Sequence, residues 1–112
     1  MLRIIYGTKG APVADYDVFN WVDYNIERYK DTLFTSFIYT SNENVLLTFA
    51  LRTLEGAIPL ECIEFYYEDE KLDFDMCLGI QNPKGTRLGI FSEVMEKSLN
   101  AGYKNMKNRK KT

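Results

Sequence analysis

The sequence predicts a single α/β domain built around one mixed sheet. Three observations support this class. Two apolar runs of strand character each give way to helical spacing, a two-stranded hairpin follows, and the chain closes on a third helical pattern. With 112 residues, of which 46% are hydrophobic and 27% charged, the chain can form one core but not two. The predicted element order is strand, helix, strand, helix, hairpin, helix.

The first half of the chain predicts a strand–helix–strand unit. Leu2 to Tyr6 is an apolar run typical of a buried strand. Asp15 or Asp17 can cap the helix that follows by accepting a backbone N–H. That helix is indicated by apolar residues at helical spacing, namely Val18, Phe19, Val22, Ile26 and Tyr29. Leu33 to Tyr39, rich in aromatic and β-branched residues, predicts the second strand.

Residues 45–54 fit two patterns. Alternation of apolar and polar residues favours a strand, whereas a polar stripe at helical spacing (Asn44, Thr48, Arg52 and Glu55) favours a helix. Ser41 is a candidate N-cap, and Gly56 lies where a helix commonly ends in a left-handed residue. These end signals favour the helix, and the strand remains the alternative.

The next segment predicts a hairpin, from Leu60 to Tyr67 and from Leu72 to Ile80. With Asp69-Glu70 as the loop, three apolar pairs fall on one face: Tyr67 with Leu72, Phe65 with Phe74, and Ile63 with Met76. The same register sets Cys62 opposite Cys77 and Glu64 opposite Asp75. We expect two free, mostly buried thiols and a solvated acidic face, rather than a redox pair and a cation site.

The C-terminal part predicts a last helix and a basic tail. Leu88, Phe91, Met95 and Leu99 recur at helical spacing, and residues 100–102 resemble a helix end. We therefore expect one domain over residues 1–102 and a flexible tail over 103–112. The tail holds five basic residues and no acid, which leaves the body with a net charge of −7. This acidic body, with no bilayer-length apolar run and no signal peptide, predicts a cytoplasmic protein with no nucleic-acid and no membrane partner.

Residue types exclude several kinds of active site. The chain has no histidine, which removes Ser-His-Asp and Cys-His catalysis and any histidine-containing zinc site. Two cysteines are too few for a structural zinc cluster. We expect no metal and no cofactor.

Two short motifs resemble a known family. Ile5-Tyr6 is followed by Ala11-Pro12-Val13-Ala14 where a strand meets a helix, and Ala57-Ile58-Pro59 precedes the third strand. This arrangement resembles glutaredoxins and thioredoxins, whose turn reads Cys-Pro-x-Cys. The resemblance implies a glutaredoxin-type thioredoxin-like fold, βαβαββα, with helices on both faces of the sheet. It also implies that Pro59 is cis and faces Pro12, with a binding groove formed by Tyr6, Lys9, Ile58 and Pro59.

The family's reaction, thiol–disulfide exchange, needs a thiolate nucleophile and a second thiol. Ala11 and Ala14 supply neither, so the resemblance implies an inactive relative, by descent or by design, of proteins whose partners carry an exposed cysteine or disulfide. One alternative is a non-enzymatic protein that binds a partner in the groove between Pro12 and Pro59. Another is an acyl-CoA-binding protein, because residues 84–89 resemble the pyrophosphate loop of GNAT acetyltransferases, although Arg87 replaces a key glycine.

Overall fold

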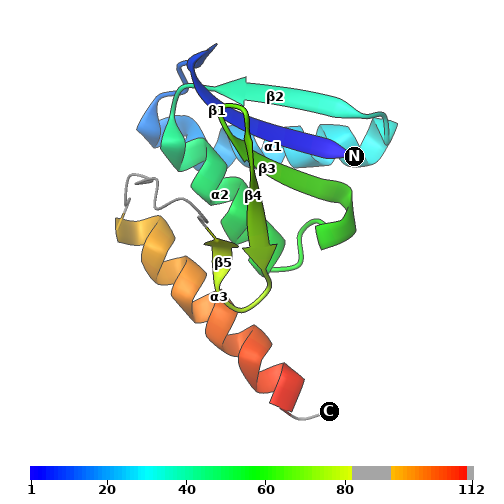
Figure 1. Ribbon diagram of the computed structural model, residues 1–112, viewed down its shortest axis with the longest axis vertical. Coiled ribbons are helices and arrows are strands. Elements are labelled where there is room, and N and C mark those ends of the chain that lie inside the picture. Colours follow the sequence, from blue (N-terminus) through cyan, green and yellow to red (C-terminus); the bar gives the residue numbers. More distant parts are fainter. Residues whose placement is uncertain (82–91, 111–112) are drawn as a thin grey trace.

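The computed structural model describes the backbone of residues 1–81 and 92–110, and the side chains of residues 1–80 and 97–108. Five strands form one sheet in the order β2-β1-β3-β4-β5 (Figure 1). β1 is parallel to both β2 and β3, whereas β3, β4 and β5 are successively antiparallel. The strands are β1 (Leu2–Ala11), β2 (Ser36–Thr40), β3 (Ile63–Tyr67), β4 (Glu70–Asp75) and β5 (Gly79–Gln81); the helices are α1 (Val18–Thr32), α2 (Glu43–Leu54) and α3 (Ser92–Lys110), with short 3₁₀ turns at Asp15–Asp17 and Leu60–Cys62. The predicted α/β class with a mixed sheet is confirmed.

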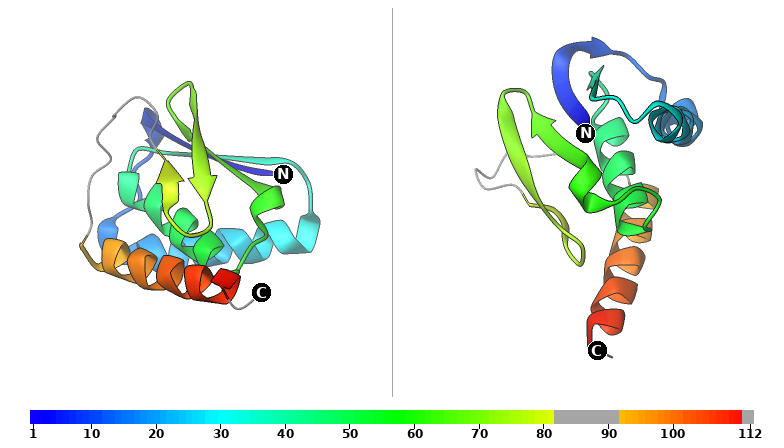
Figure 2. Two further views of the ribbon diagram at one scale, coloured as in Figure 1. Left: turned by 60° about the horizontal axis from the view of Figure 1, so that its bottom comes forward. Right: turned by 90° about the vertical axis from the view of Figure 1, so that its right-hand side faces the viewer.

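The described helices lie on one face of the sheet, so the expectation of helices on both faces is wrong for the described residues. Leu2 and Ile4 of β1 are buried in one core with residues of α1 and α2. Phe37 and Tyr39 of β2 point to the other face, where more than half of each side chain is exposed. Figure 2 shows the same single layer. A second layer is not required, because the other face carries tyrosine and charged side chains that can stay hydrated.

This arrangement gives the two strand–helix–strand connections, β1–α1–β2 and β2–α2–β3, opposite handedness. α1 connects β1 to β2 on one side of β1, and α2 connects β2 to β3 on the other side. Because both helices lie on the same face, one of the two connections departs from the usual right-handed rule.

The core is centred on α2. Val45, Leu46, Phe49 and Leu51 are fully buried, and the Trp21 ring of α1 meets Phe49 edge to face at 6.5 Å. The sheet, α1 and α3 all contact α2, so apolar residues surround much of its circumference. This explains why residues 45–54 showed no clean helical period, although the helix that we favoured is confirmed.

The ends of α2 are fixed by polar contacts. The N-cap is Asn42, whose side chain accepts the Asn44 N–H at 2.9 Å, and not Ser41 as expected. Gly56, just past the last turn, has a φ of 85°, as predicted for a left-handed helix end.

The hairpin is confirmed, but its register differs by two residues from the prediction. Phe65 pairs with Leu72 and Tyr67 with Glu70, so the loop is Glu68-Asp69. A shift of two residues keeps every side chain on its predicted face, so the apolar pattern could not distinguish the two registers. In the observed register Glu68, the first loop residue, has a φ of 54°, and its N–H donates to the Tyr6 carbonyl oxygen of β1 at 2.7 Å.

The second hairpin strand is shorter than predicted, because the chain turns at residues 76–78 and returns as β5. The Asp75 carboxylate accepts the N–H groups of Cys77 and Leu78 at 2.7 and 3.0 Å. Gly79 follows with a φ of 80°, a conformation that favours glycine. The single strand expected from Leu72 to Ile80 is therefore wrong, and β5 was missed.

The last helix continues well past Gly102, so the expected helix end at residues 100–102 is wrong. Gly102 is buried against the turn after β4, and a Cβ at this position would overlap the carbonyl oxygen of Cys77. The glycine permits close approach of α3 and does not end it. Asn105 holds the same contact by donating to the carbonyl oxygens of Leu54 and Met76 at 3.0 and 2.5 Å. Residues 103–110, expected to be a flexible tail, are helical. Among the residues that the structure describes, no helix is long and apolar enough to cross a membrane.

Three strand boundaries also differ from the prediction. β3 begins at Ile63 and not at Leu60, because Leu60–Cys62 form a 3₁₀ turn. Leu33 ends α1 with a φ of 58°, and its N–H donates to the Tyr29 carbonyl oxygen, so β2 begins only at Ser36. β1 runs beyond Tyr6 to Ala11, and both of these residues pair with Thr40. Residues 7–10 therefore bulge out between them, and Gly10 lies so close to Thr40 that a Cβ would overlap its backbone.

Gly10→Ala should destabilise the fold by about 1–3 kcal/mol, because the added methyl group must displace the Thr40 backbone. Gly7→Ala is the matched control, since a Cβ there meets nothing within 4 Å. Urea denaturation of both variants measures the difference. Equal free energies of unfolding for the two variants would contradict the close approach.

Candidate functional site

The turn that resembles a redox motif is tied to the start of α2. The Asn42 side-chain amide donates to the Val13 carbonyl oxygen and to the Asp15 carboxylate, both at 2.7 Å. The Thr40 hydroxyl donates to the Ala11 carbonyl oxygen at 3.1 Å. These bonds fix residues 11–15 between the end of β1 and the helix, which gives the turn a structural role.

The first turn of α2 already has an anion of its own. Asn44 donates a further hydrogen bond to the Asp15 carboxylate at 3.1 Å. The hydrogen bonds from Asn42 and then Asn44 lower the pKa of Asp15 below its usual value. The expected capping of the first helix by Asp15 or Asp17 is wrong, since neither makes a side-chain cap bond there. Asp15 instead accepts hydrogen bonds from the Asn42 and Asn44 side chains at the start of α2.

A shallow hollow of about 560 Å³ lies beside this turn, between it and α1. Its walls come from two segments: Ala11, Pro12, Val13, Ala14, Asp17, Asn20, Trp21 and Tyr24. They contain no thiol and no imidazole, so the hollow has no nucleophile for thiol exchange. Its walls offer apolar contact and aromatic stacking, and Asp17 and Asn20 add polar groups that can form hydrogen bonds.

Pro59 does not lie beside Pro12. The Ile58–Pro59 peptide is not cis, since the described residues contain no cis peptide bond. Because β3 is parallel to β1, with Ile63 opposite Leu2, Pro59 precedes β3 near the start of β1. Pro12 follows the other end of that strand. A meeting of the two prolines would require β3 to run antiparallel to β1, so both expectations for Pro59 are wrong.

The four residues of the expected groove are therefore dispersed. Ile58 is buried in the core, and Lys9 is exposed in the bulge of β1. The Tyr6 ring packs on the Tyr67 ring at a centroid distance of 4.8 Å, at the opposite end of the sheet from Pro59. Burial is the largest cause of the raised pKa of Tyr6, followed by the nearby Glu43 carboxylate.

The two cysteines are free and half-buried, rather than mostly buried as expected. Cys62 ends the 3₁₀ turn before β3, and Cys77 lies in the turn after β4, so the observed hairpin register no longer sets them opposite each other. The residues that the structure describes contain no group of three or more cysteine, aspartate or glutamate side chains able to hold a metal ion. The loop that resembles a GNAT pyrophosphate loop lies outside the described residues.

The face of the sheet opposite the helices carries a charge network around Glu64. Its carboxylate contacts Arg3 and Lys71, each at 2.8 Å, and accepts a hydrogen bond from the Tyr66 hydroxyl at 3.3 Å. Lys71 first and Arg3 second lower the pKa of Glu64 to about 2. Glu64 therefore pairs with cations, and the predicted facing of Glu64 and Asp75 is wrong because of the register shift.

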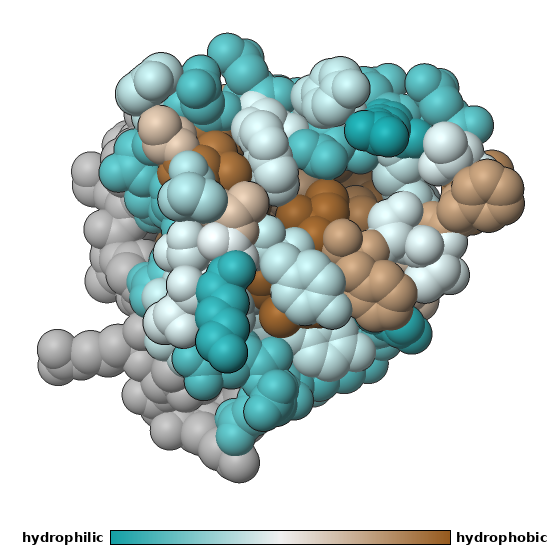
Figure 3. Space-filling model, turned by 90° about the horizontal axis from the view of Figure 1, so that it is seen from above, coloured by the Kyte–Doolittle hydropathy of each residue, from teal (hydrophilic) through white to brown (hydrophobic). Residues whose placement is uncertain are grey.

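The same face exposes two aromatic side chains on β2, which lies at one edge of the sheet. Phe37 and Tyr39 are 52% and 57% exposed, and the Arg3 guanidinium lies 5.3 Å from the centre of the Phe37 ring. Leu33 and Phe34, just before β2, are exposed as well. Figure 3 shows the molecule from the side where β2 lies, with hydrophobic side chains gathered among polar ones. We call Phe37, Tyr39 and the outer edge of β2 the β2 edge surface.

Sequence reasoning missed this surface. The aromatic and β-branched residues of Leu33 to Tyr39 predicted a strand, but a strand between two neighbours has the same composition. The position of β2 at the edge depends on which strands pair, and no local pattern records that.

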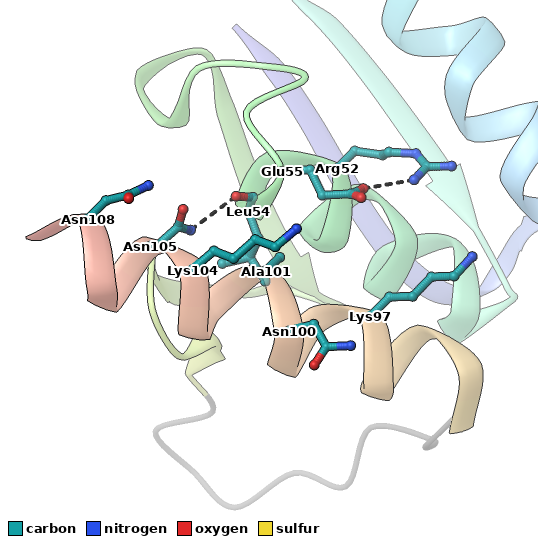
Figure 4. Close-up of a pocket in the computed structure, with 9 residues that line it drawn as sticks. All are labelled: Arg52, Leu54, Glu55, Lys97, Asn100, Ala101, Lys104, Asn105 and Asn108. Atoms are coloured by element: carbon teal, nitrogen blue, oxygen red, sulfur yellow. Dashed lines mark hydrogen bonds and ion pairs between the residues drawn. The ribbon is translucent and has the colours of Figure 1, made fainter.

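A second hollow, of about 530 Å³, lies between the end of α2 and α3 (Figure 4). Arg52 on its wall is neutralised by Asp23 and Glu55, at 2.7 and 2.8 Å. The ammonium groups of Lys97 and Lys104 add positive charge to a mostly polar lining. Such a lining favours small anions over apolar ligands.

Comparison with known proteins gave no relative: no family model, no curated protein and no solved structure matches the chain. The class that the structure defines is a small α/β domain with one helical layer, one open sheet face and an exposed edge strand.

The network around Glu64 predicts a specific acid sensitivity. The folded pKa is about 2 against an ordinary 4.5, so these contacts stabilise the fold above pH 4.5, and the contribution is lost as the pH falls toward 2. Glu64→Gln should lower the free energy of unfolding at pH 7 by about 1 kcal/mol and flatten its fall over that pH range. Urea denaturation at a series of pH values measures both effects.

Glu61→Gln, at an exposed position outside the network, is the control. Equal pH profiles for Glu64→Gln and the wild type would show that the network does not form.

Proposed function

We propose that this chain is a non-enzymatic binding module that takes an extended segment of a partner protein along β2. The observation that carries the proposal is the pair of exposed aromatic residues on an edge strand that, among the described residues, pairs with β1 alone. Addition of a strand to an open edge is a recurring mode of peptide recognition, in which main-chain hydrogen bonds give affinity and side chains give specificity.

The backbone of β2 supports this mode. The Ser36 N–H donates to the Met1 carbonyl oxygen, so Ser36 directs its backbone groups toward β1. Alternate residues of a strand direct these groups to opposite sides. Phe37 and Tyr39 therefore direct their N–H and C=O groups outward, where an added strand can bind them.

The side chains of the same two residues support it as well. Phe37 and Tyr39 lie on the open face, next to where the side chains of an added strand would stand. The Arg3 guanidinium lies over the Phe37 ring and restrains it before any partner binds. Aromatic residues of this kind often supply most of the binding energy at protein interfaces.

β2 also lacks the features that protect edge strands from pairing. It contains no proline and no charged residue, whereas Glu64, Lys71 and Asp73 occupy the open face of β3 and β4. Natural proteins commonly place lysine, proline or a bulge on an exposed edge to prevent association. The absence of these residues from β2 favours an edge that is used for binding.

Peptides selected by phage display for binding to this chain test the proposal. For a selected peptide, Phe37→Lys/Tyr39→Lys should weaken binding at least about tenfold, since it removes both aromatic contacts and adds charge to the edge. Calorimetry measures the affinity. Tyr16→Lys/Tyr24→Lys is the matched control, because it makes the same chemical change at two exposed tyrosines away from the sheet edge.

The control variant should bind as the wild type does. Selected peptides that bind the two variants equally well, or whose NMR shift changes map to the hollow beside Trp21, would contradict the proposal.

A further inference from the structure

A second exposed surface lies on α3, far along the chain from the β2 edge surface. Leu99, Tyr103 and Met106 are 67%, 58% and 38% exposed. At about 100° per residue these three side chains fall within about 60° of one another around the helix axis. They form an apolar stripe, which we call the α3 stripe.

The attachment of α3 to the domain fixes where this stripe points. Gly102 and Asn105 face the turn after β4, and Asn105 also reaches the end of α2. The stripe lies next to Gly102 around the helix, and Leu78 of the turn that Gly102 contacts is exposed as well. Figure 1 shows that the C-terminal part of α3 extends beyond the sheet and the other helices.

Cationic residues border the stripe. The Lys107 ammonium lies 4.7 Å from the centre of the Tyr103 ring. Lys104 is exposed about 60° further around the helix, on the side of the hollow between α2 and α3. By sequence the helix continues with Arg109 and Lys110, and residues 103–110 contain four basic residues and no acidic one.

We propose that the α3 stripe and its basic border dock on the surface of an anionic phospholipid bilayer, without crossing it. Apolar side chains of a surface helix enter the boundary between headgroups and acyl chains, while lysines beside them contact lipid phosphates. The proposal is independent of the β2 edge surface.

The chemistry favours a lipid surface over nucleic acid. Phosphodiester backbones would attract the lysines, but they give Leu99 and Met106 nothing to pack against. The body of the chain, with a net charge of −7 without residues 103–112, would be repelled by either polyanion. Extension of α3 beyond the sheet and the other helices lessens that repulsion. The sequence predicted no membrane partner from net charge and from the lack of a spanning segment, and contact with a bilayer surface requires neither.

Vesicle flotation tests the proposal, with vesicles of phosphatidylcholine alone and of phosphatidylcholine mixed with phosphatidylglycerol. The wild type should bind the mixed vesicles at least about tenfold more strongly, and added salt should weaken this binding. Leu99→Glu/Met106→Glu should reduce binding at least about tenfold, because it places charge in the apolar stripe. Lys104→Gln/Lys107→Gln should remove much of the preference for phosphatidylglycerol.

Two controls separate this surface from others. Tyr16→Glu/Tyr24→Glu adds the same charge at exposed tyrosines away from α3 and should leave vesicle binding unchanged. Phe37→Lys/Tyr39→Lys alters only the β2 edge surface and should not weaken vesicle binding, since the two added lysines are cationic. The two proposals can therefore fail separately. Circular dichroism confirms that each variant is folded.

Three results would overturn the proposal. One is equal binding of the wild type to the two kinds of vesicle, or none to either. Another is that the folded Leu99→Glu/Met106→Glu variant binds the mixed vesicles as strongly as the wild type does. The third is tighter binding to a labelled DNA duplex than to the mixed vesicles.

Discussion

The parallel pairing of β3 with β1 is the constraint on which the rest of this structure depends. β1 has parallel neighbours on both sides, so β2 and β3 both begin at the end of the sheet where β1 begins. The segment before β3 therefore lies far from the turn after β1, which separates Pro59 from Pro12. The same pairing leaves β2 with β1 as its one neighbour in the sheet and an open outer edge.

A second consequence concerns the two faces of the sheet. α1 and α2 pack side by side on one face and enclose a core centred on Phe49. The other face is held by the contacts of Glu64 with Arg3 and Lys71, which need water on one side and tolerate no apolar layer above them. The molecule thus has one face that stabilises it and one face that remains available for contact.

Local patterns predicted much of the fold. The helical spacing of α1, the stop signal of α2 at Gly56 and the two faces of the hairpin were all readable in the sequence, because each depends on residues a few positions apart. The helix end expected near Gly102 was wrong because glycine also permits close approach, and only the contact with Cys77 shows which use applies here.

Long-range relations could not be predicted in the same way. The direction of β3, the two-residue shift of the hairpin and the edge position of β2 depend on backbone pairing between distant segments. The prediction of the candidate site was affected most. The expected groove between Pro12 and Pro59 required β3 to run antiparallel to β1, and no single motif specifies the direction of a strand. The β2 edge surface was not predictable for the same reason.

We propose that this small domain works by contact with partners. The segment around Ala11 and Ala14 joins β1 to α2, and its hydrogen bonds to Asn42 and Thr40 give it a purely structural use. The exposed chemistry lies elsewhere, on the β2 edge surface and on the α3 stripe, and each suits a different partner.

Hydrogen exchange of the free chain, followed by NMR, tests the central claim most directly. If β2 is an open edge, the amides of Phe37 and Tyr39 point to solvent and should exchange much faster than the amide of Ile38, which faces β1, and the amide of Ile4, which faces β3. An alternating pattern of fast and slow exchange along β2 is the predicted result. Equal protection of Phe37, Ile38 and Tyr39 would show that the edge is already covered and would contradict the account.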